Sequence, residues 1–176
     1  PTQQKSNNHS QKDNEKRPVA NLVDIYNTSI GHNSVLLLNV PPDRRGLIHE
    51  IDAERITAFG KYISTNFDKS LTKGKNCYWS ATNGDSREYE VEGDKMINTL
   101  LIQEDISRGQ RVEEFSVEAF INGRWQHLAE GTTIGYKRLI RFSDCRAERV
   151  RVTIDRCRTT ANISNVGLYY AEPLKD

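Results

Sequence analysis

Hydrophobic and polar residues alternate most clearly in residues 115–121, FSVEAFI. Successive side chains of a strand point to opposite faces, so one set of this stretch faces inward. The inward set is Phe115, Val117, Ala119 and Ile121. Asn122-Gly123 follows and suits a two-residue turn with positive φ at both positions. Residues 124–130 then alternate again, so the pattern predicts a β-hairpin with Trp125 buried in its second strand.

Short segments with period-2 hydrophobicity, separated by turn residues, continue from about residue 70 to the end of the chain. The predicted strands are residues 78–79, 88–91, 96–103, 115–121, 124–130, 138–142, 149–154 and 166–170. Eight short strands in about a hundred residues are typical of an antiparallel β-sandwich or jelly roll. Val150, Val152 and Ile154 form the clearest inward face, and the arginines between them are expected to be solvated.

The spacing of hydrophobic residues is different before residue 70. Apolar residues at helical spacing predict a helix from Val19 to Ile30, with Gly31 as its left-handed cap, and a second helix around residues 51–63. Between them, residues 34–40, SVLLLNV, form a continuous apolar run that predicts a strand buried on both faces. A single such strand needs partners, which we expect to lie outside this chain.

The chain therefore divides into three predicted parts, and its fold class is α+β but mainly β. Residues 1–18 contain almost no apolar side chain and are expected to be a disordered polar tail. Residues 19–66 form a helix-strand-helix unit, and residues 70–176 form the sandwich.

Composition excludes several classes of function. The formal net charge is only +1, which does not favour nucleic acid as a partner. No apolar run is long enough to span a membrane. Three widely spaced cysteines and four scattered histidines match no metal-binding pattern, and nothing indicates a cofactor. The cysteines are expected to be buried thiols, with a bridge between Cys145 and Cys157 left open.

Two motifs resemble one family of enzymes. Residues 33–63, NSVLLLNVPPDRRGLIHEIDAERITAFGKYI, are similar to the closing strand and helix of the (β/α)8 catalytic barrel in bacterial α-L-fucosidases, glycoside hydrolase family 29. Residues 100–138, which include QEDISRGQRVEEFSVE and GTTIGYKR, resemble the discoidin-like, galactose-binding-like sandwich that follows this barrel. The resemblance covers the chain from Val19 to Leu174.

The resemblance implies a parent enzyme that removes α-L-fucose from glycans with retention, through one nucleophilic and one acid/base carboxylate. The family takes both from barrel segments that precede the part represented here, so no catalytic residue is assigned and the chain is expected to be inactive alone. Its implied partners are the missing barrel and, through it, a fucosylated glycan. The implied location is periplasmic or secreted.

Three groups of residues are candidates for functional or structural roles. Asn39, Asp43 and Arg44 follow the predicted barrel strand and are candidates for the active-site rim, although a solvated Asp43–Arg44 pair in a proline-fixed loop is the simpler interpretation. Sugar-stacking candidates in the sandwich are Tyr78 and Trp79, with core packing as the alternative. Glu104, Arg111 and Arg138 are expected to be structural, with the glutamate bridging to an arginine.

The leading hypothesis is a sandwich that stabilises the catalytic barrel. A lectin-like module or a pure interaction domain remain as alternatives.

Overall fold

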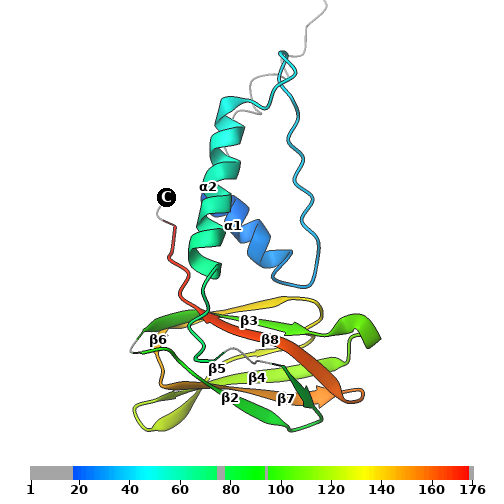
Figure 1. The fold of residues 1–176 in the computed structure, drawn as a ribbon, viewed down its shortest axis with the longest axis vertical. Helices are drawn as coiled ribbons and strands as arrows, with labels where there is room; N and C mark the ends of the chain where they lie inside the picture. The colour runs from blue at the N-terminus through cyan, green and yellow to red at the C-terminus, as the bar shows by residue number, and fades with distance from the viewer. Residues whose placement is uncertain (1–17, 75–77, 94, 175–176) are drawn as a thin grey trace, which may run out of the picture.

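A computed structural model describes residues 18–74, 78–93 and 95–174 of the 176-residue chain. Two helices stand above a β-sandwich (Figure 1). The helices are α1 (Val19–Thr28) and α2 (Glu50–Phe67), and a short 3-10 helix, η1 (Ile106–Arg108), follows β3. The strands are β1 (Trp79–Ala81), β2 (Ser86–Glu90), β3 (Met96–Glu104), β4 (Val112–Ile121), β5 (Arg124–Gly131), β6 (Arg138–Arg146), β7 (Arg149–Cys157) and β8 (Ala161–Tyr169).

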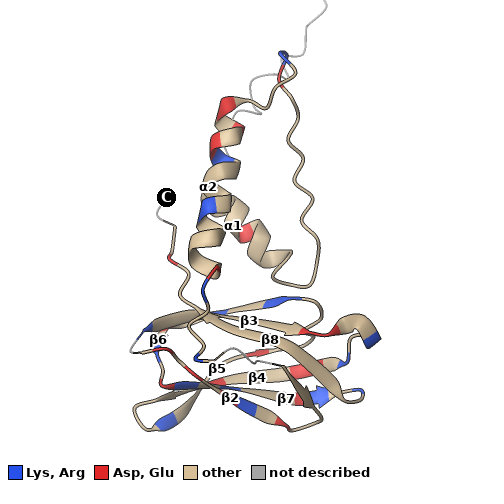
Figure 2. Cartoon of the chain, in the orientation of Figure 1, with Lys and Arg blue, Asp and Glu red and all other residues tan. Residues whose placement is uncertain are grey.

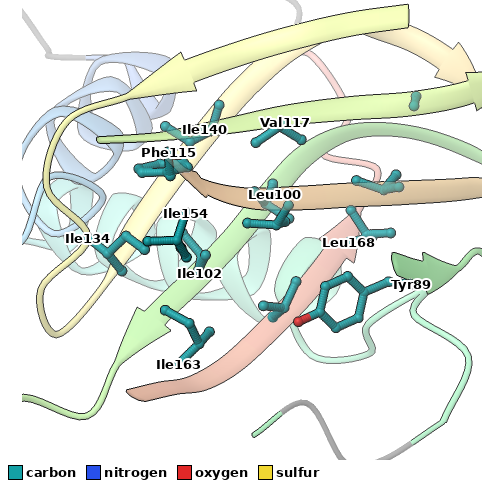
Figure 3. Packing of buried hydrophobic residues seen from close by; sticks show 14 of the residues in the cluster. Tyr89, Leu100, Ile102, Phe115, Val117, Ile134, Ile140, Ile154, Ile163 and Leu168 are labelled. Atoms are coloured by element: carbon teal, nitrogen blue, oxygen red, sulfur yellow. The ribbon is translucent and has the colours of Figure 1, made fainter. Parts of the chain in front are cut away.

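The strands form two four-stranded sheets that pack face to face. One sheet has the order β1-β8-β3-β6 and the other β2-β7-β4-β5, and every neighbouring pair is antiparallel. Their inner faces enclose a core of aliphatic and aromatic side chains (Figure 3). Residues with less than 2% exposure include Ile97, Leu100, Ile102, Phe115, Val117, Val150, Val152, Ile154, Ile163 and Leu168. The predicted mainly β, antiparallel sandwich is confirmed.

The predicted hairpin is β4 and β5. Asn122 and Gly123 have φ of 53° and 78°, as a two-residue turn requires. The prediction that Trp125 is buried was wrong, because Trp125 pairs with Phe120 and shares its face, which points away from the core. A register shift between Val117 and Glu118 accompanies this pairing.

Both helices form where apolar spacing predicts them, but the first ends differently. Gly31 does not have positive φ, so the expected left-handed cap is wrong; the cap residue is Ser29, with right-handed backbone angles. Gly31 is instead required by close packing, since a Cβ there would lie 2.3 Å from the carbonyl oxygen of Asn27. Neither helix is long and apolar enough to cross a membrane.

Residues 34–40 are not a buried strand in this chain. They run away from the sandwich toward the start of α2, without ladder partners among the described residues (Figure 1). Val35 is 86% exposed and Leu37 is 92% exposed. No described strand lies beside this run, so its burial between strands from outside this chain stays a prediction.

Cys145 and Cys157 are free thiols and partly buried, so no bridge joins them. Burial raises the pKa of both thiols above its ordinary value. Cys77 lies outside the described residues, as does the predicted polar tail except Pro18.

Candidate functional site

An aromatic and aliphatic cluster joins the two helices to the outer face of the β1-β8-β3-β6 sheet. We call it the junction cluster. Its buried members are Tyr26, Leu101, Leu139 and Tyr169, and its partly buried members are Ile30, Phe59, Ile63 and Phe67. The helices therefore bury apolar side chains against the sandwich, separately from the core between the two sheets.

Tyr26 is the central side chain of the junction cluster, at 7% exposure. Its ring meets Phe59 edge-on at 6.0 Å and Phe67 at 6.3 Å, and Phe67 lies 5.4 Å from Tyr169. Lys137 Nζ donates to the Tyr26 hydroxyl at 2.7 Å and lies 5.1 Å from the ring centroid. One residue of α1 thus contacts both α2 and the residue that precedes β6.

Backbone hydrogen bonds fix the chain just before the exposed apolar run. Asn33 N donates to Lys137 O at 3.0 Å, and Leu139 N donates to Gly31 O at 2.8 Å. The Asn33 side chain also accepts from Tyr136 N at 2.7 Å. The exposed run therefore begins at a residue that pairs with the sandwich.

The C-terminal segment holds α2 from another side. The Tyr62 hydroxyl donates to Glu172 O at 2.8 Å, and Glu172 N donates to the side-chain oxygen of Asn66 at 2.9 Å. Burial raises the pKa of Tyr62 above its ordinary value. The second half of α2 is consequently attached to both the sheet and the C-terminal segment.

The exposed apolar residues near the helices lie between Asn33 and α2. They are Val35, Leu37, Leu38, Leu47 and Ile48, and all are at least 40% exposed. No charged residue occurs from residue 25 to residue 42, so this stretch is uniformly uncharged in Figure 2. Exposed apolar residues gathered in one stretch of chain are typical of an interaction site.

The predicted rim residues lie at the far end of this run and in the loop that follows it. The solvated pair expected between Asp43 and Arg44 is instead a pair between Asp43 and Arg45. Arg45 Nη2 lies 2.6 Å from Asp43 Oδ2 and 2.7 Å from Glu50 Oε1. The bond from Arg45 lowers the pKa of Asp43. Asn39 and Arg44 are exposed, and their role at the active-site rim stays a prediction.

Glu104 fastens a loop, but through backbone amides rather than the expected guanidinium. Its Oε1 accepts from Arg111 N at 2.6 Å and from Val112 N at 3.3 Å, and the residue is 2% exposed. Burial raises the Glu104 pKa, and these backbone bonds oppose the rise. The Arg111 guanidinium donates to Thr160 O at 2.6 Å, and Arg138 pairs with Ile102 in the sheet.

Tyr78 and Trp79 lie at the start of β1. Tyr78 is 50% exposed, and Arg87 donates to its carbonyl at 2.8 Å. Trp79 packs partly buried against the sandwich core, with its indole nitrogen inaccessible to solvent. A sugar-stacking role for the two stays a prediction.

Sequence reasoning missed the junction cluster. Tyr26 and Phe59 fall within the two predicted helices, but helical spacing does not show which sheet face they meet. Among the described residues there is no group of side chains that could hold a metal ion.

Comparisons with known proteins agree on one family. The α-L-fucosidase family model matches residues 2–68, which extends the resemblance upstream of Val19. α-L-fucosidase 1 of Arabidopsis thaliana is 30% identical over 87% of this chain and 36% of its own length. A crystal structure assigned to the α-L-fucosidases, from Bacteroides ovatus, is 48% identical with a TM-score of 0.90, over 96% of this chain and 29% of that one.

A family 29 fucosidase from Ruminococcus gnavus, solved in complex with fucose, is 28% identical with a TM-score of 0.78. It matches 89% of this chain and 37% of its own. The chain thus spans about a third of the length of these relatives. By sequence and by fold, it belongs to the α-L-fucosidases of glycoside hydrolase family 29.

Proposed function

We propose that the junction cluster and the sandwich hold residues 34–40 in place as a strand of a (β/α)8 barrel, and that the assembled enzyme hydrolyses α-L-fucosides in glycans with retention. The sandwich stabilises the barrel in this proposal. The barrel supplies both carboxylates, because a retaining mechanism needs a nucleophile and an acid/base group at short separation.

The observation that carries the proposal is the exposure of an uncharged apolar run that leads away from a well-packed sandwich. Leu37 at 92% exposure and Val35 at 86% leave apolar surface in water, and burying that surface against a partner is favourable. Residues with a strand pattern and free backbone groups are suited to pairing with neighbouring strands. The resemblance of residues 33–63 to a closing barrel strand and helix supports barrel strands as those neighbours.

Assembly can be tested by co-expressing the 176-residue chain with the barrel portion of the Bacteroides ovatus relative. We expect co-elution in size-exclusion chromatography and hydrolysis of p-nitrophenyl α-L-fucopyranoside by the complex. The 176-residue chain alone should give no turnover.

Leu37→Lys should abolish co-elution and turnover, since it places a charge at a position that the barrel would bury. Ile106→Lys is the matched control, because Ile106 is also exposed, at 41%, but lies in η1 on the sandwich. Hydrolysis by the chain alone, or equal assembly of the Leu37→Lys variant, would overturn the proposal.

A further inference from the structure

A hollow of about 390 Å³ opens at one end of the sandwich, and none of its lining residues belongs to the junction cluster. It lies where three connections meet: the one after β2, the β4–β5 turn and the β6–β7 turn. The described residues that line it are Gly93, Phe120, Ile121, Asn122, Arg146, Ala147 and Glu148. Its volume falls within the range of small-molecule sites.

The backbone of Glu148 connects the three segments around the hollow. Glu148 N donates to Phe120 O at 3.0 Å, and Glu148 O accepts from Val91 N at 3.0 Å. Ala147 beside it is buried, at 7% exposure. The walls are therefore fixed to β2 and β4 before any ligand arrives, which lowers the entropic cost of binding.

An aromatic and cationic stack supports one wall. The ring centroids of Phe120 and Trp125 are 5.2 Å apart, and Arg149 Cζ lies 4.5 Å from the Phe120 centroid. Arg151 Cζ lies 3.8 Å from the Trp125 centroid, and its Nε lies 3.3 Å from Glu118 Oε2. Phe120 belongs both to this stack and to the hollow.

The polar side chains of the hollow are of mixed kind. Asn122 and Glu148 are exposed, and no described residue bonds either side chain. Arg146 adds a cation. The hollow thus combines an amide, a carboxylate, a guanidinium and an aromatic ring.

We propose that this hollow binds a neutral pyranose unit of a glycan. A pyranose has an apolar face that packs on an aromatic ring and hydroxyls that both donate and accept hydrogen bonds. Glu148 accepts from the hydroxyls, Asn122 does both, and Arg146 donates. An anionic ligand fits less well, because Glu148 would repel it.

The site is distinct from the predicted pair Tyr78 and Trp79. It also does not depend on residues 34–40, so it can be tested on the 176-residue chain without a barrel. Failure of sugar binding would leave the assembly proposal unaffected, and failure of assembly would leave this one unaffected.

The test is a titration of the ¹⁵N-labelled 176-residue chain with methyl α-L-fucopyranoside and with methyl β-D-galactopyranoside, followed by NMR. We expect saturable amide shifts with at least one sugar, confined to residues 120–123 and 146–149 and to the Trp125 indole. Glu148→Gln should weaken binding about tenfold, because a hydrogen bond to a charged group contributes roughly that factor. Phe120→Ala should weaken it by a similar factor.

Two variants serve as matched controls, each checked by thermal unfolding together with the test variants. Glu130→Gln changes an exposed carboxylate of β5, and Tyr136→Ala removes an aromatic ring that is 65% exposed elsewhere. Both should bind like the unchanged chain. Absence of saturable shifts with both sugars, shifts centred on Tyr78 and Trp79, or unchanged affinity of folded Glu148→Gln would each overturn the proposal.

Discussion

Replacing Tyr26 by alanine should release both helices while the sandwich stays folded. Tyr26 is the residue that contacts Phe59 and Phe67 of α2 and Lys137 before β6. The sandwich core contains none of these residues, since it lies between the two sheets. The structure therefore predicts local rather than global loss of stability.

The size of the effect follows from the interactions that Tyr26 makes. Removing a buried aromatic side chain costs about 3–5 kcal/mol, of which each aromatic pair supplies about 0.5–1.5 kcal/mol. Tyr26→Phe removes only the hydroxyl that Lys137 contacts at 2.7 Å. Its cost should be about 1–2 kcal/mol, because Lys137 is only partly buried.

Hydrogen exchange of the 176-residue chain measures this directly. Tyr26→Ala should speed amide exchange in α1 and α2 by a factor of at least about a hundred, which corresponds to about 2.8 kcal/mol. Amides of β3 and β7 should keep their protection, and Tyr26→Phe should be intermediate. Asn21→Ala, at an exposed position of α1, is the control and should change little.

Unchanged exchange in α2 of the alanine variant would refute the central role of Tyr26. Equal loss of protection in β7 and α2 would refute the separation of the junction cluster from the sandwich core.

Two further predictions concern backbone packing and pH. Gly31→Ala should destabilise the junction by about 1–3 kcal/mol, since its Cβ would lie 2.3 Å from Asn27 O and 3.1 Å from Leu139 Cβ. Gly60→Ala lies in α2, where the added Cβ would meet no atom within 4 Å, and it should instead stabilise the chain by about 0.5–1 kcal/mol. Thermal unfolding of both variants checks this, and equal shifts of the unfolding temperature would contradict it. Burial raises the Glu104 pKa above its ordinary 4.5, so the folded state keeps the Glu104 proton to a higher pH than the unfolded state does. The contribution of Glu104 to stability therefore falls as pH rises from 4.5 through the folded pKa. Glu104→Gln should lack that fall in denaturant titrations across this range, whereas an identical pH dependence in both proteins would contradict the assignment.

The sheet framework could be predicted from sequence because each strand has its own local pattern. Alternation places every second side chain of residues 115–121 inward, beginning with Phe115, and the structure confirms this. The same holds for Val150, Val152 and Ile154. The Asn122-Gly123 turn requires positive φ and few dipeptides supply it, so the hairpin was recognisable. These features depend on near neighbours in the chain.

Features that depend on distant partners were not predictable in the same way. Trp125 lies on the outer face with Phe120, in a strand pair with a register shift that alternation does not reveal. Asp43 pairs with Arg45 rather than Arg44 because the loop geometry decides which guanidinium reaches it. The hollow at Phe120 and Glu148 joins three connections that are far apart in sequence.

The two fixed ends of the exposed apolar run bear on how it could pair with barrel strands. Asn33 bonds Lys137 before the run, and α2, which begins after it at Glu50, packs on the sandwich through Phe59 and Phe67. A segment held at both ends loses less entropy on docking than a free tail, because loop closure is completed during folding. A slip of one residue in strand pairing would turn every side chain to the opposite face, and here it would also require breaking the Asn33–Lys137 bond or moving α2. In the proposed enzyme the sandwich would therefore determine the register in which residues 34–40 close the barrel, and not only its stability.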